Sequence, residues 1–391
     1  MIDKSEVIIK GNKIKACIKC IYGQNTPGIK FDEHGVCNYC HMIDDLKKQY
    51  KTGTEEGLHE LMRIISTIKE EGRGKKYDCV VGVSGGTDSS FMLAKAVEWG
   101  LRPLAAHYDN TWNTAIATEN IRKITKKLGV DLYTHVVDNK ESDDIFRSFC
   151  LACVPELDGP TDIALAETLY RAAAKYKVRY ILEGHSFMTE GVSPLASAYV
   201  DGKYIKSIHK QFGVVKMKTF PNMDFLSFMK WILVKRIKKI RPLWYISYSK
   251  EDAKKYLEGE FCWHDYGGHH LENRMTAFNH SVWFPQKFNI DQRNNSLSAA
   301  VRAGILSRGK ALEIYNEPPY IEPELVGYFK KRLGFSDSEY QAIMDGPKKT
   351  YRDYPTYKKL FEQLRPLFFV LAKANLVPMS FYIKYTSITE I

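Results

Sequence analysis

The segment that most constrains the fold is the hexapeptide Ser-Gly-Gly-Thr-Asp-Ser at residues 84–89, which lies between an apolar run and a helical pattern. The run from Tyr77 to Val83 is short and rich in β-branched residues, which predicts a buried parallel strand. After the hexapeptide, apolar residues recur with helical periodicity as far as Gly100, a suitable C-terminal cap. Glycines let backbone N–H groups approach phosphate oxygens, and the start of a helix favours negative charge. We therefore predict a phosphate-binding loop formed by Ser84, Gly85, Gly86, Thr87, Asp88 and Ser89.

Strand and helix patterns alternate after this loop. We expect strands at 102–108, 131–137 and 179–182, and helices at about 114–128 and 162–176. This alternation predicts an α/β fold built on a doubly wound parallel sheet. Ligands of such sheets bind at the carboxyl ends of the strands, so residues that follow the strands should join the loop in one site. The residues selected on this ground are His107, Asp109, Asn110, Gly184, His185 and Glu190.

The hexapeptide matches neither the Walker A spacing nor Gly-x-Gly-x-x-Gly. It resembles the PP-loop of the ATP pyrophosphatase superfamily, whose fold is HUP-like. The resemblance implies that the loop grips the β,γ-pyrophosphate of ATP while a substrate oxygen attacks the α-phosphate. Asp88 is then the first candidate ligand for Mg²⁺ and Glu190 the second, although either acid could instead be a helix cap or a surface residue.

Four of the eight cysteines are paired at the spacing of a metal knuckle: Cys17 with Cys20, and Cys37 with Cys40. Each Cys-x-x-Cys places two thiolates on one tight turn, and two such turns complete a tetrahedral set that suits Zn²⁺. Four thiolates leave no position for a water molecule, so we expect a structural rather than a catalytic zinc site.

Three further cysteines leave two interpretations open. Cys150 and Cys153 form another Cys-x-x-Cys, and Cys262 could complete a redox or iron–sulfur site with them. The simpler interpretation is that two cysteines at the end of an apolar helix are packing residues.

Several motifs together resemble one family, the bacterial N-acetyl sugar amidotransferases related to WbpG and PseA. The resemblance covers nearly the whole chain. It rests on the cysteine knuckle with its PGI-x-FDE-x-GVCNYC segment, on VGVSGGTDSS and YDNTWN, and on TEGVSP at 189–194, YGGHHLENRMTAFNH at 266–280 and KFNIDQRNNSLSAAVRAGILSR at 287–308. Enzymes of this family act in the biosynthesis of surface polysaccharides (O-antigen) and of flagellin glycans.

The family implies a reaction on a nucleotide-activated N-acetyl sugar. ATP adenylates the amide oxygen, ammonia attacks the imidate carbon, and an acetamidino sugar forms with release of AMP. We take His185, His269, His270 and Arg274 as candidates to screen the developing charge, and Asp88 and Glu190 as catalytic candidates through the Mg²⁺ that would share this role. His270 and Arg274 are four residues apart and would share one face of a helix.

The source of ammonia is expected to be a partner. The sequence has neither a cysteine after its initial Met1 nor a Gly-x-Cys-x-Gly elbow, so we expect no glutaminase within it. The resemblance implies glutaminase and cyclase-like subunits similar to those of imidazole glycerol phosphate synthase.

Positive charge is concentrated in one segment. The net charge of the chain is +11, and residues 201–241 hold eleven Lys and Arg against two Asp. Residues 225–240 show the apolar spacing of an amphipathic basic helix. This helix could pack on the core, dock a partner, or attract an anionic membrane or nucleotide-sugar. A local patch favours one anionic surface over general nucleic-acid binding, and we expect no nucleic-acid partner.

The length of 391 residues, with 44% hydrophobic and 26% charged residues, is typical of a globular chain of about two or three domains. We expect a zinc knuckle at 1–50, an ATP-binding α/β domain at 51–200, a basic amphipathic insertion at 201–242, and a mainly helical C-terminal substrate or partner region at 243–391. No apolar stretch is long enough to span a membrane and no signal peptide is recognisable, so we expect a cytoplasmic protein. The alternative function is that of a PP-loop tRNA-thiolating enzyme, which would use Cys150, Cys153 and Cys262.

Overall fold

A five-stranded parallel sheet lies at the centre of the molecule, in the order β5-β4-β3-β6-β7. The computed structural model describes residues 6–192, 199–267, 271–374 and 376–387. The strands are β3 (Cys79–Gly82), β4 (Pro103–Asp109), β5 (Leu132–Val136), β6 (Tyr180–Leu182) and β7 (Lys238–Ile240). The connecting helices are α3 (Thr87–Glu98), α4 (Ala115–Leu128), α5 (Asn139–Ala152) and α6 (Gly159–Lys175). The predicted α/β fold with a doubly wound parallel sheet is confirmed.

The winding of the sheet reverses between β3 and β6. The chain runs from β3 to β4 on one side and from β6 to β7 on the other, so the carboxyl ends of β3 and β6 border a crevice. Glycine allows the two following loops to touch at this point, because a β-carbon on Gly184 would lie 2.6 Å from the carbonyl oxygen of Asp88. The residues after β3 and after β6 are therefore neighbours.

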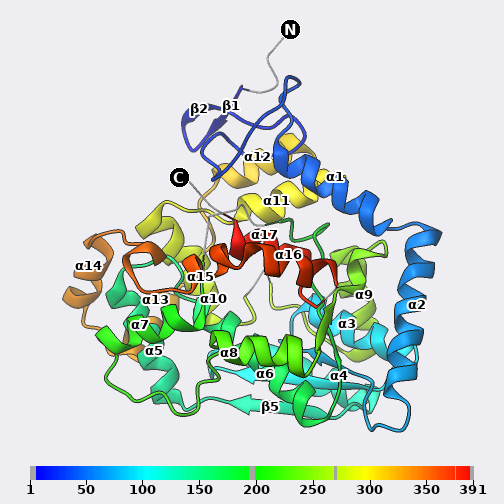
Figure 1. Cartoon of the computed structure of the whole chain (residues 1–391). Coiled ribbons are helices and arrows are strands. Elements are labelled where there is room, and N and C mark those ends of the chain that lie inside the picture. The colour runs from blue at the N-terminus through cyan, green and yellow to red at the C-terminus, as the bar shows by residue number, and fades with distance from the viewer. Residues whose placement is uncertain (1–5, 193–198, 268–270, 375, 388–391) are drawn as a thin grey trace.

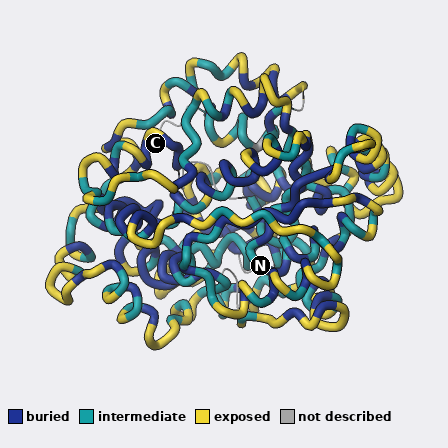
Figure 2. Tube along the Cα trace, turned by 90° about the horizontal axis from the view of Figure 1, so that it is seen from below, coloured by how far each residue is buried: buried dark blue, intermediate teal, exposed yellow. Residues whose placement is uncertain are grey.

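Both faces of the sheet are covered by helices. One face packs against α2 (Glu55–Gly72), α3 and α9 (Lys250–Phe261). The other face packs against α6 and against α16 (Arg365–Lys373) from the far end of the chain. Figure 2 shows that the buried residues are concentrated in the interior of the molecule. Among the described residues, no helix combines the length and the apolar character that a membrane span requires.

The predicted amphipathic helix over residues 225–240 is wrong in its second half. Helical structure is limited to α8 (Phe225–Met229) and the π-helical turn η1 (Lys230–Val234), after which the chain enters β7. Strand β7 pairs with β6, and one basic side chain on β7 and another just after it reach back to the same acid. Lys239 Nζ lies 2.7 Å from one Glu183 carboxylate oxygen and Arg241 Nε 3.0 Å from the other. Pairing with a neighbouring strand has thus overridden the local helical spacing. The segment therefore contributes an edge strand to the sheet, and the proposed boundaries at residues 50, 200 and 242 stay predictions.

The C-terminal region is helical, as expected. One more helix, α7 (Gly202–Phe212), lies between β6 and α8 in the sequence. After β7, the helices of this region are α9, α10 (Arg274–Phe278), η3 (Asn279–Phe288), α11 (Arg293–Arg302), α12 (Arg308–Asn316), α13 (Leu325–Leu333), α14 (Asp337–Asp345), α15 (Lys358–Gln363), α16 and α17 (Met379–Thr386), with short 3₁₀ turns η2 (Pro242–Trp244) and η4 (Tyr351–Asp353). Figure 1 shows α16 and α17 near the middle of the molecule, between the N-terminal hairpin and the sheet.

The N-terminal part packs on the C-terminal helices. It consists of the hairpin β1 (Glu6–Ile9) and β2 (Asn12–Lys15), the cysteine knuckle and α1 (Asn38–Tyr50), which leads into α2. Arg308 Nε, at the start of α12, donates to the carbonyl oxygens of Cys17 and Cys20 at 3.0 Å each. Figure 1 shows this part seated over α11 and α12, at the opposite end of the molecule from β5.

We expect Glu183→Ala to lower the free energy of unfolding by about 3 kcal/mol, because Lys239 and Arg241 would lose their shared carboxylate in a partly buried setting. Burial alone would raise the pKa of Glu183, but the two cations hold it well below its usual range. This stabilisation is therefore present above the usual glutamate pKa and is lost as the pH falls below it. Urea denaturation at neutral and acidic pH measures both effects.

The matched control is Glu98→Ala, which removes an exposed pair with Lys95 and should cost less than about 1 kcal/mol. Equal losses in the two variants would contradict the account.

Candidate functional site

The hexapeptide loop follows β3 directly and is fixed by its glycines. Gly85 has a φ of +83°, and a β-carbon there would lie 2.2 Å from the carbonyl oxygen of Ala117 at the start of α4. The carbonyl oxygen of Gly85 accepts hydrogen bonds from Trp263 Nε1 at 3.1 Å and from Asn120 Nδ2 at 3.3 Å. The loop is therefore held against α4 on its carbonyl side, in a conformation that only glycine adopts without strain.

The loop ends at the N-terminus of α3, where backbone N–H groups lack partners within the helix. The N-cap is Gly86, which has no side chain to satisfy them. The Ser89 hydroxyl accepts from the Ser84 N–H at 3.2 Å and so closes the loop on itself. The buried Ser90 hydroxyl has no hydrogen-bond partner within the described part of the chain. Unpartnered donors, a helix N-terminus and glycines together fit an anion such as a phosphate.

Asp88, in the first turn of α3, is held by two residues from a distant segment. Lys250 Nζ lies 3.0 Å from one carboxylate oxygen, and the Tyr248 hydroxyl donates to the other. Burial alone would lower the pKa of Lys250, but Asp88, Glu190 and Glu272 raise it, so the ammonium is charged. This lysine therefore contributes a positive charge to the crevice beside the loop.

His185 and Glu190 form a second pair beside the loop. Trp244 Nε1 donates to His185 Nδ1 at 3.3 Å, which leaves the proton on Nε2, 3.3 Å from a Glu190 carboxylate oxygen. Burial, followed by the positive charge of Arg241, lowers the pKa of His185 to about 4. His185 is therefore a neutral hydrogen-bond donor near pH 7, not the cation that the sequence suggested.

A cluster of amides links the end of β4 to the C-terminal region. Asn273 Nδ2 donates to Asn110 Oδ1 and to Asn113 Oδ1, both at 2.9 Å, while its own Oδ1 accepts from the first N–H groups of α10. Asn113 Nδ2 in turn lies 3.1 Å from His107 Nε2, whose Nδ1 donates to the Val83 carbonyl oxygen at 2.8 Å. Burial lowers the pKa of His107, which is therefore neutral.

A cavity of about 430 Å³ opens beside these groups. Its wall includes Ser84 from the loop and His107 and Asn110 from the end of β4. On the far side it includes Glu272, Asn273 and His280 from the segment that leads into and follows α10. The carboxyl ends of two strands thus share one cavity with the C-terminal region.

The structure brings most of the predicted site residues together. The loop, His107, Asn110, Gly184, His185 and Glu190 surround the crevice, and Asp109 accepts from the Thr111 N–H at 2.7 Å at its edge. Arg274 is not part of this group. Its guanidinium lies 3.6 Å from Glu322 and 4.6 Å from the ring centre of Tyr328, which belongs to α13. His269 and His270 lie outside the described residues.

The sequence reasoning did not select Lys250, Tyr248 or Asn273. One signal for Lys250 was present, since a lysine in the first turn of a helix opposes the helix dipole unless an acid compensates it. Asn273 is the N-cap of α10, a position where asparagine is common. The sequence therefore explains this residue by its capping role and gives no sign of its contacts with Asn110 and Asn113.

The four knuckle cysteines converge on one point. All four are buried and their sulfur atoms lie within 4.8 Å of one another. The Sγ atoms of Cys17 and Cys40 are 3.8 Å apart, as are those of Cys20 and Cys37. This distance is the edge of a tetrahedron whose centre lies about 2.3 Å from each sulfur, the length of a Zn–S bond. The donor set therefore fits a tetrahedral metal ion.

The other cysteines do not gather. Cys150 and Cys153 are buried in the apolar cluster at the end of α5, whereas Cys262 is exposed at the end of α9. Within the described residues, the knuckle is the one group of three or more cysteine, histidine or acidic side chains whose ligand atoms lie close enough together to hold a metal ion. The packing interpretation of Cys150 and Cys153 fits this arrangement.

A parallel α/β sheet with the Ser-Gly-Gly-Thr-Asp-Ser loop at its switch point defines a PP-loop protein. Residues 272–365 match the family model described as "LPS biosynthesis protein WbpG-like, C-terminal domain". This part of the chain is therefore similar to the C-terminal domain of WbpG-like proteins.

Comparisons with individual proteins are more distant. An uncharacterized protein of Methanocaldococcus jannaschii is 29% identical over 178 residues, which cover 43% of this chain and 58% of that relative. The U34-tRNA thiolase NcsA from Methanococcus maripaludis superposes with a TM-score of 0.31 at 16% identity, over 78% of this chain and 89% of that chain. The NH3-dependent NAD synthetase from Campylobacter jejuni gives a TM-score of 0.31 at 12% identity, over 74% and 98%.

Elemental analysis should find one metal ion per chain, which we expect to be zinc. Cys37→Ser should lose that ion, because three thiolates no longer complete the tetrahedral set. Cys262→Ser is the matched control and should keep the metal, since this thiol is exposed and outside the knuckle. Full metal content in Cys37→Ser would contradict the assignment.

Proposed function

We propose that this protein is an ATP-dependent, AMP-forming amidotransferase that converts the N-acetyl group of a nucleotide-activated sugar into an acetamidino group. The observation that carries the proposal is the junction of a PP-loop with a WbpG-like C-terminal domain around one cavity. The product would serve the synthesis of O-antigen lipopolysaccharide or flagellin glycan, and we place the reaction in the cytoplasm.

The chemistry requires activation of an unreactive amide. Adenylation transfers AMP from ATP to the amide oxygen and releases pyrophosphate. Ammonia then adds to the imidate carbon, and the former amide oxygen leaves as part of AMP. In this proposal Ser84–Ser89 bind the pyrophosphate end of ATP through backbone N–H groups, and Lys250 adds a positive charge to the same place.

The neutral polar residues have positioning roles in this proposal. His107 and Asn110 border the nucleotide side of the cavity, with the carboxylate of Asp109 next to them in the chain. Gly184 gives the second loop room to approach the first. His185 would donate a hydrogen bond from Nε2 and is oriented for this by Trp244. We retain His270 as a candidate, whereas the contacts of Arg274 with Glu322 and Tyr328 favour a structural role.

Mg²⁺ is expected to accompany ATP. Mg²⁺ binds proteins through one or two carboxylates and keeps its other positions for water and substrate phosphates. Asp88 and Glu190 are the acids at the crevice that would supply those carboxylates, with Lys250 released from Asp88 to a phosphate oxygen. The ion would neutralise charge on the phosphates.

The proposed partners follow from the need for ammonia. A glutaminase and a cyclase-like subunit, similar to those of imidazole glycerol phosphate synthase, would produce ammonia from glutamine and deliver it to the cavity. The exposed part of the basic segment, which includes Lys235 and Arg236, is one candidate docking surface.

The tRNA-thiolating alternative is less well supported. It calls for an iron–sulfur or persulfide site at Cys150, Cys153 and Cys262, and these residues lie in separate places. The basic stretch at 201–241 favours it, but three cations of this stretch pair with acids of the chain. Lys206 pairs with Asp224, and Lys239 and Arg241 pair with Glu183. Retention of tRNA together with an iron chromophore would favour this alternative over the amidotransferase.

The central test is mass spectrometry of UDP- and CMP-linked N-acetyl sugars incubated with the protein, ATP, Mg²⁺ and ammonium. We expect a product lighter by the difference between O and NH, formed in equal amount to AMP.

Gly85→Ala should abolish AMP formation, because a β-carbon at this position collides with the Ala117 carbonyl group. Gly327→Ala on α13 is the matched control, as its β-carbon meets open space, and it should retain activity. AMP formation that is unchanged in Gly85→Ala would contradict the role of the loop.

Free ammonium, but not glutamine, should support turnover by the isolated protein. Initial rates of AMP release with each nitrogen source, at equal concentration and fixed pH, measure this difference. Robust turnover with glutamine and no added subunit would refute the need for a partner.

A further inference from the structure

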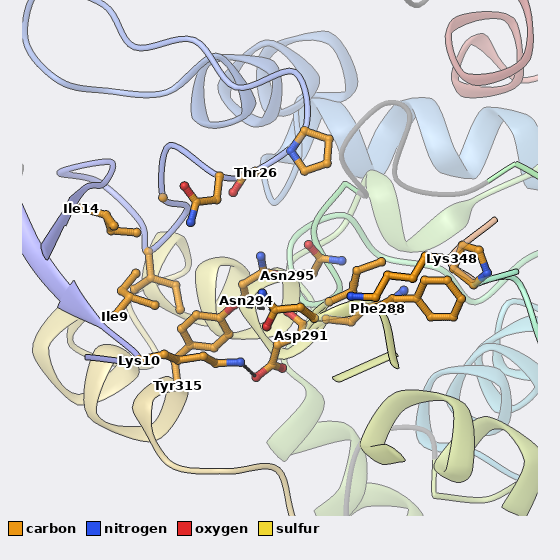
Figure 3. Close-up of a pocket in the computed structure, with 18 of the residues that line it drawn as sticks. Ile9, Lys10, Ile14, Thr26, Phe288, Asp291, Asn294, Asn295, Tyr315 and Lys348 are labelled. Carbon is orange, nitrogen blue, oxygen red and sulfur yellow. Dashed lines mark hydrogen bonds and ion pairs between the residues drawn. The ribbon is translucent and has the colours of Figure 1, made fainter. Parts of the chain in front are cut away.

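A second and larger cavity lies between the N-terminal part and the C-terminal helices. Its volume is about 890 Å³, within the usual range of about 300–1,000 Å³ for ligand sites. The hairpin β1–β2 and the knuckle form one wall, and the segments 288–295 and 348–352 form the other. Figure 3 shows Ile9 and Ile14 at one end, Lys348 near Phe288 at the other, and Asn294 and Asn295 between them.

The walls of this cavity carry an excess of positive charge. Six Lys or Arg line it against two acids, Glu156 and Asp291. Asp291 is already paired, with Lys10 at 3.0 Å and with Arg293 at 2.7 Å. Burial raises the pKa of Glu156 to about 7, so this acid opposes the cations only in part near neutral pH. An anionic ligand would therefore be favoured.

The cations concentrate at one end. Lys348, Lys349 and Arg352 come from the short stretch 348–352, which follows α14 and runs into η4, and Lys384 comes from α17. Within the described residues, neither Lys348 nor Lys384 forms an ion pair, and both are exposed. Four cations from two elements around one space suit a group with several phosphate oxygens better than a single carboxylate.

The middle of the cavity is lined by amides and aromatic rings. Asn25, Asn289, Gln292, Asn294 and Asn295 offer both donors and acceptors, and Tyr315 offers a ring. Amides of this kind hydrogen-bond to hydroxyl groups and to the edges of nucleobases, and rings stack on planar or apolar faces. A nucleoside and a sugar present such hydroxyl groups, base edges and planar faces.

The two cavities adjoin. Glu156, Gln292 and Lys384 line both the larger cavity and the cavity beside the PP-loop. A ligand whose charged end lay on the lysines could therefore extend past these three residues toward Ser84.

We propose that the larger cavity binds the nucleoside diphosphate part of the sugar substrate, with its diphosphate on Lys348, Lys349, Arg352 and Lys384 and its sugar directed past Gln292 to the PP-loop. The identity of the transferred group rests on the proposed function, whereas binding of a nucleoside diphosphate here does not. The assignment also gives the metal knuckle a role, because Asn25 and its neighbours close the cavity.

Isothermal titration calorimetry with the full chain tests the proposal. The affinities for UDP, CDP, GDP and dTDP are each compared with the affinity for the corresponding monophosphate. We expect at least one diphosphate to bind, and to bind more tightly than its monophosphate. Lys348→Glu/Lys349→Glu should weaken that binding by about tenfold or more, since each reversal places a negative charge beside the phosphates. Lys384→Glu, on a separate helix, should act in the same direction. Affinity for ATP at the PP-loop should stay within a factor of about two in Lys348→Glu/Lys349→Glu, because these two residues do not line the cavity beside the loop.

The matched control is Lys126→Glu/Lys127→Glu, which reverses two exposed charges in the last turn of α4, outside the cavity, and should leave diphosphate binding unchanged. Circular dichroism and metal content establish that each variant is folded. The proposal is overturned if none of the four diphosphates binds, or if both cavity variants bind as tightly as the original chain.

The two hypotheses fail separately. Diphosphate binding that depends on the cavity lysines, without conversion of any N-acetyl sugar, would support this inference and contradict the proposed function. Conversion of a sugar whose diphosphate binding ignores the lysines would support the proposed function and overturn this inference.

Discussion

The side chain of Asn273 holds the two halves of the site in register. Its amide nitrogen bridges Asn110 and Asn113 at the end of β4, and its carbonyl oxygen caps α10. A buried amide that satisfies donors and acceptors on two segments fixes both in position, since any shift would leave polar groups without partners. The PP-loop belongs to the sheet and the opposite wall of its cavity to the C-terminal helices, so the cavity exists only while this junction holds.

Charge compensation is the second constraint on the crevice. Asp88 pairs with Lys250, and Glu183 pairs with Lys239 and Arg241, while His185 stays neutral beside Glu190. The acids needed for a metal ion and the cations needed for phosphates are therefore present together and hold one another in place. Phosphates and a divalent ion, when bound, can exchange partners with Asp88 and Lys250 without leaving an isolated charge in the crevice.

Sequence reasoning was reliable where a short segment determines its own structure. The phosphate loop, the alternating strands and helices and the Cys-x-x-Cys pairs each follow from local spacing, and each was predicted. It failed where partners are distant in sequence. Residues 225–240 have helical spacing, but pairing of Lys238–Ile240 with β6 ends the helix early. Lys250 and Asn273 acquire their importance from Asp88 and Asn110, which are about 160 residues away, and no local pattern reports such contacts.

The most direct test of the central claim follows one oxygen atom. The sugar substrate is prepared with heavy oxygen in its N-acetyl carbonyl group and incubated with the protein, ATP, Mg²⁺ and ammonium, and the phosphate-containing products are analysed by mass spectrometry. If the PP-loop positions ATP for adenylation of the amide, the heavy atom must appear in AMP. Label in pyrophosphate or in inorganic phosphate, with unlabelled AMP, would contradict the account.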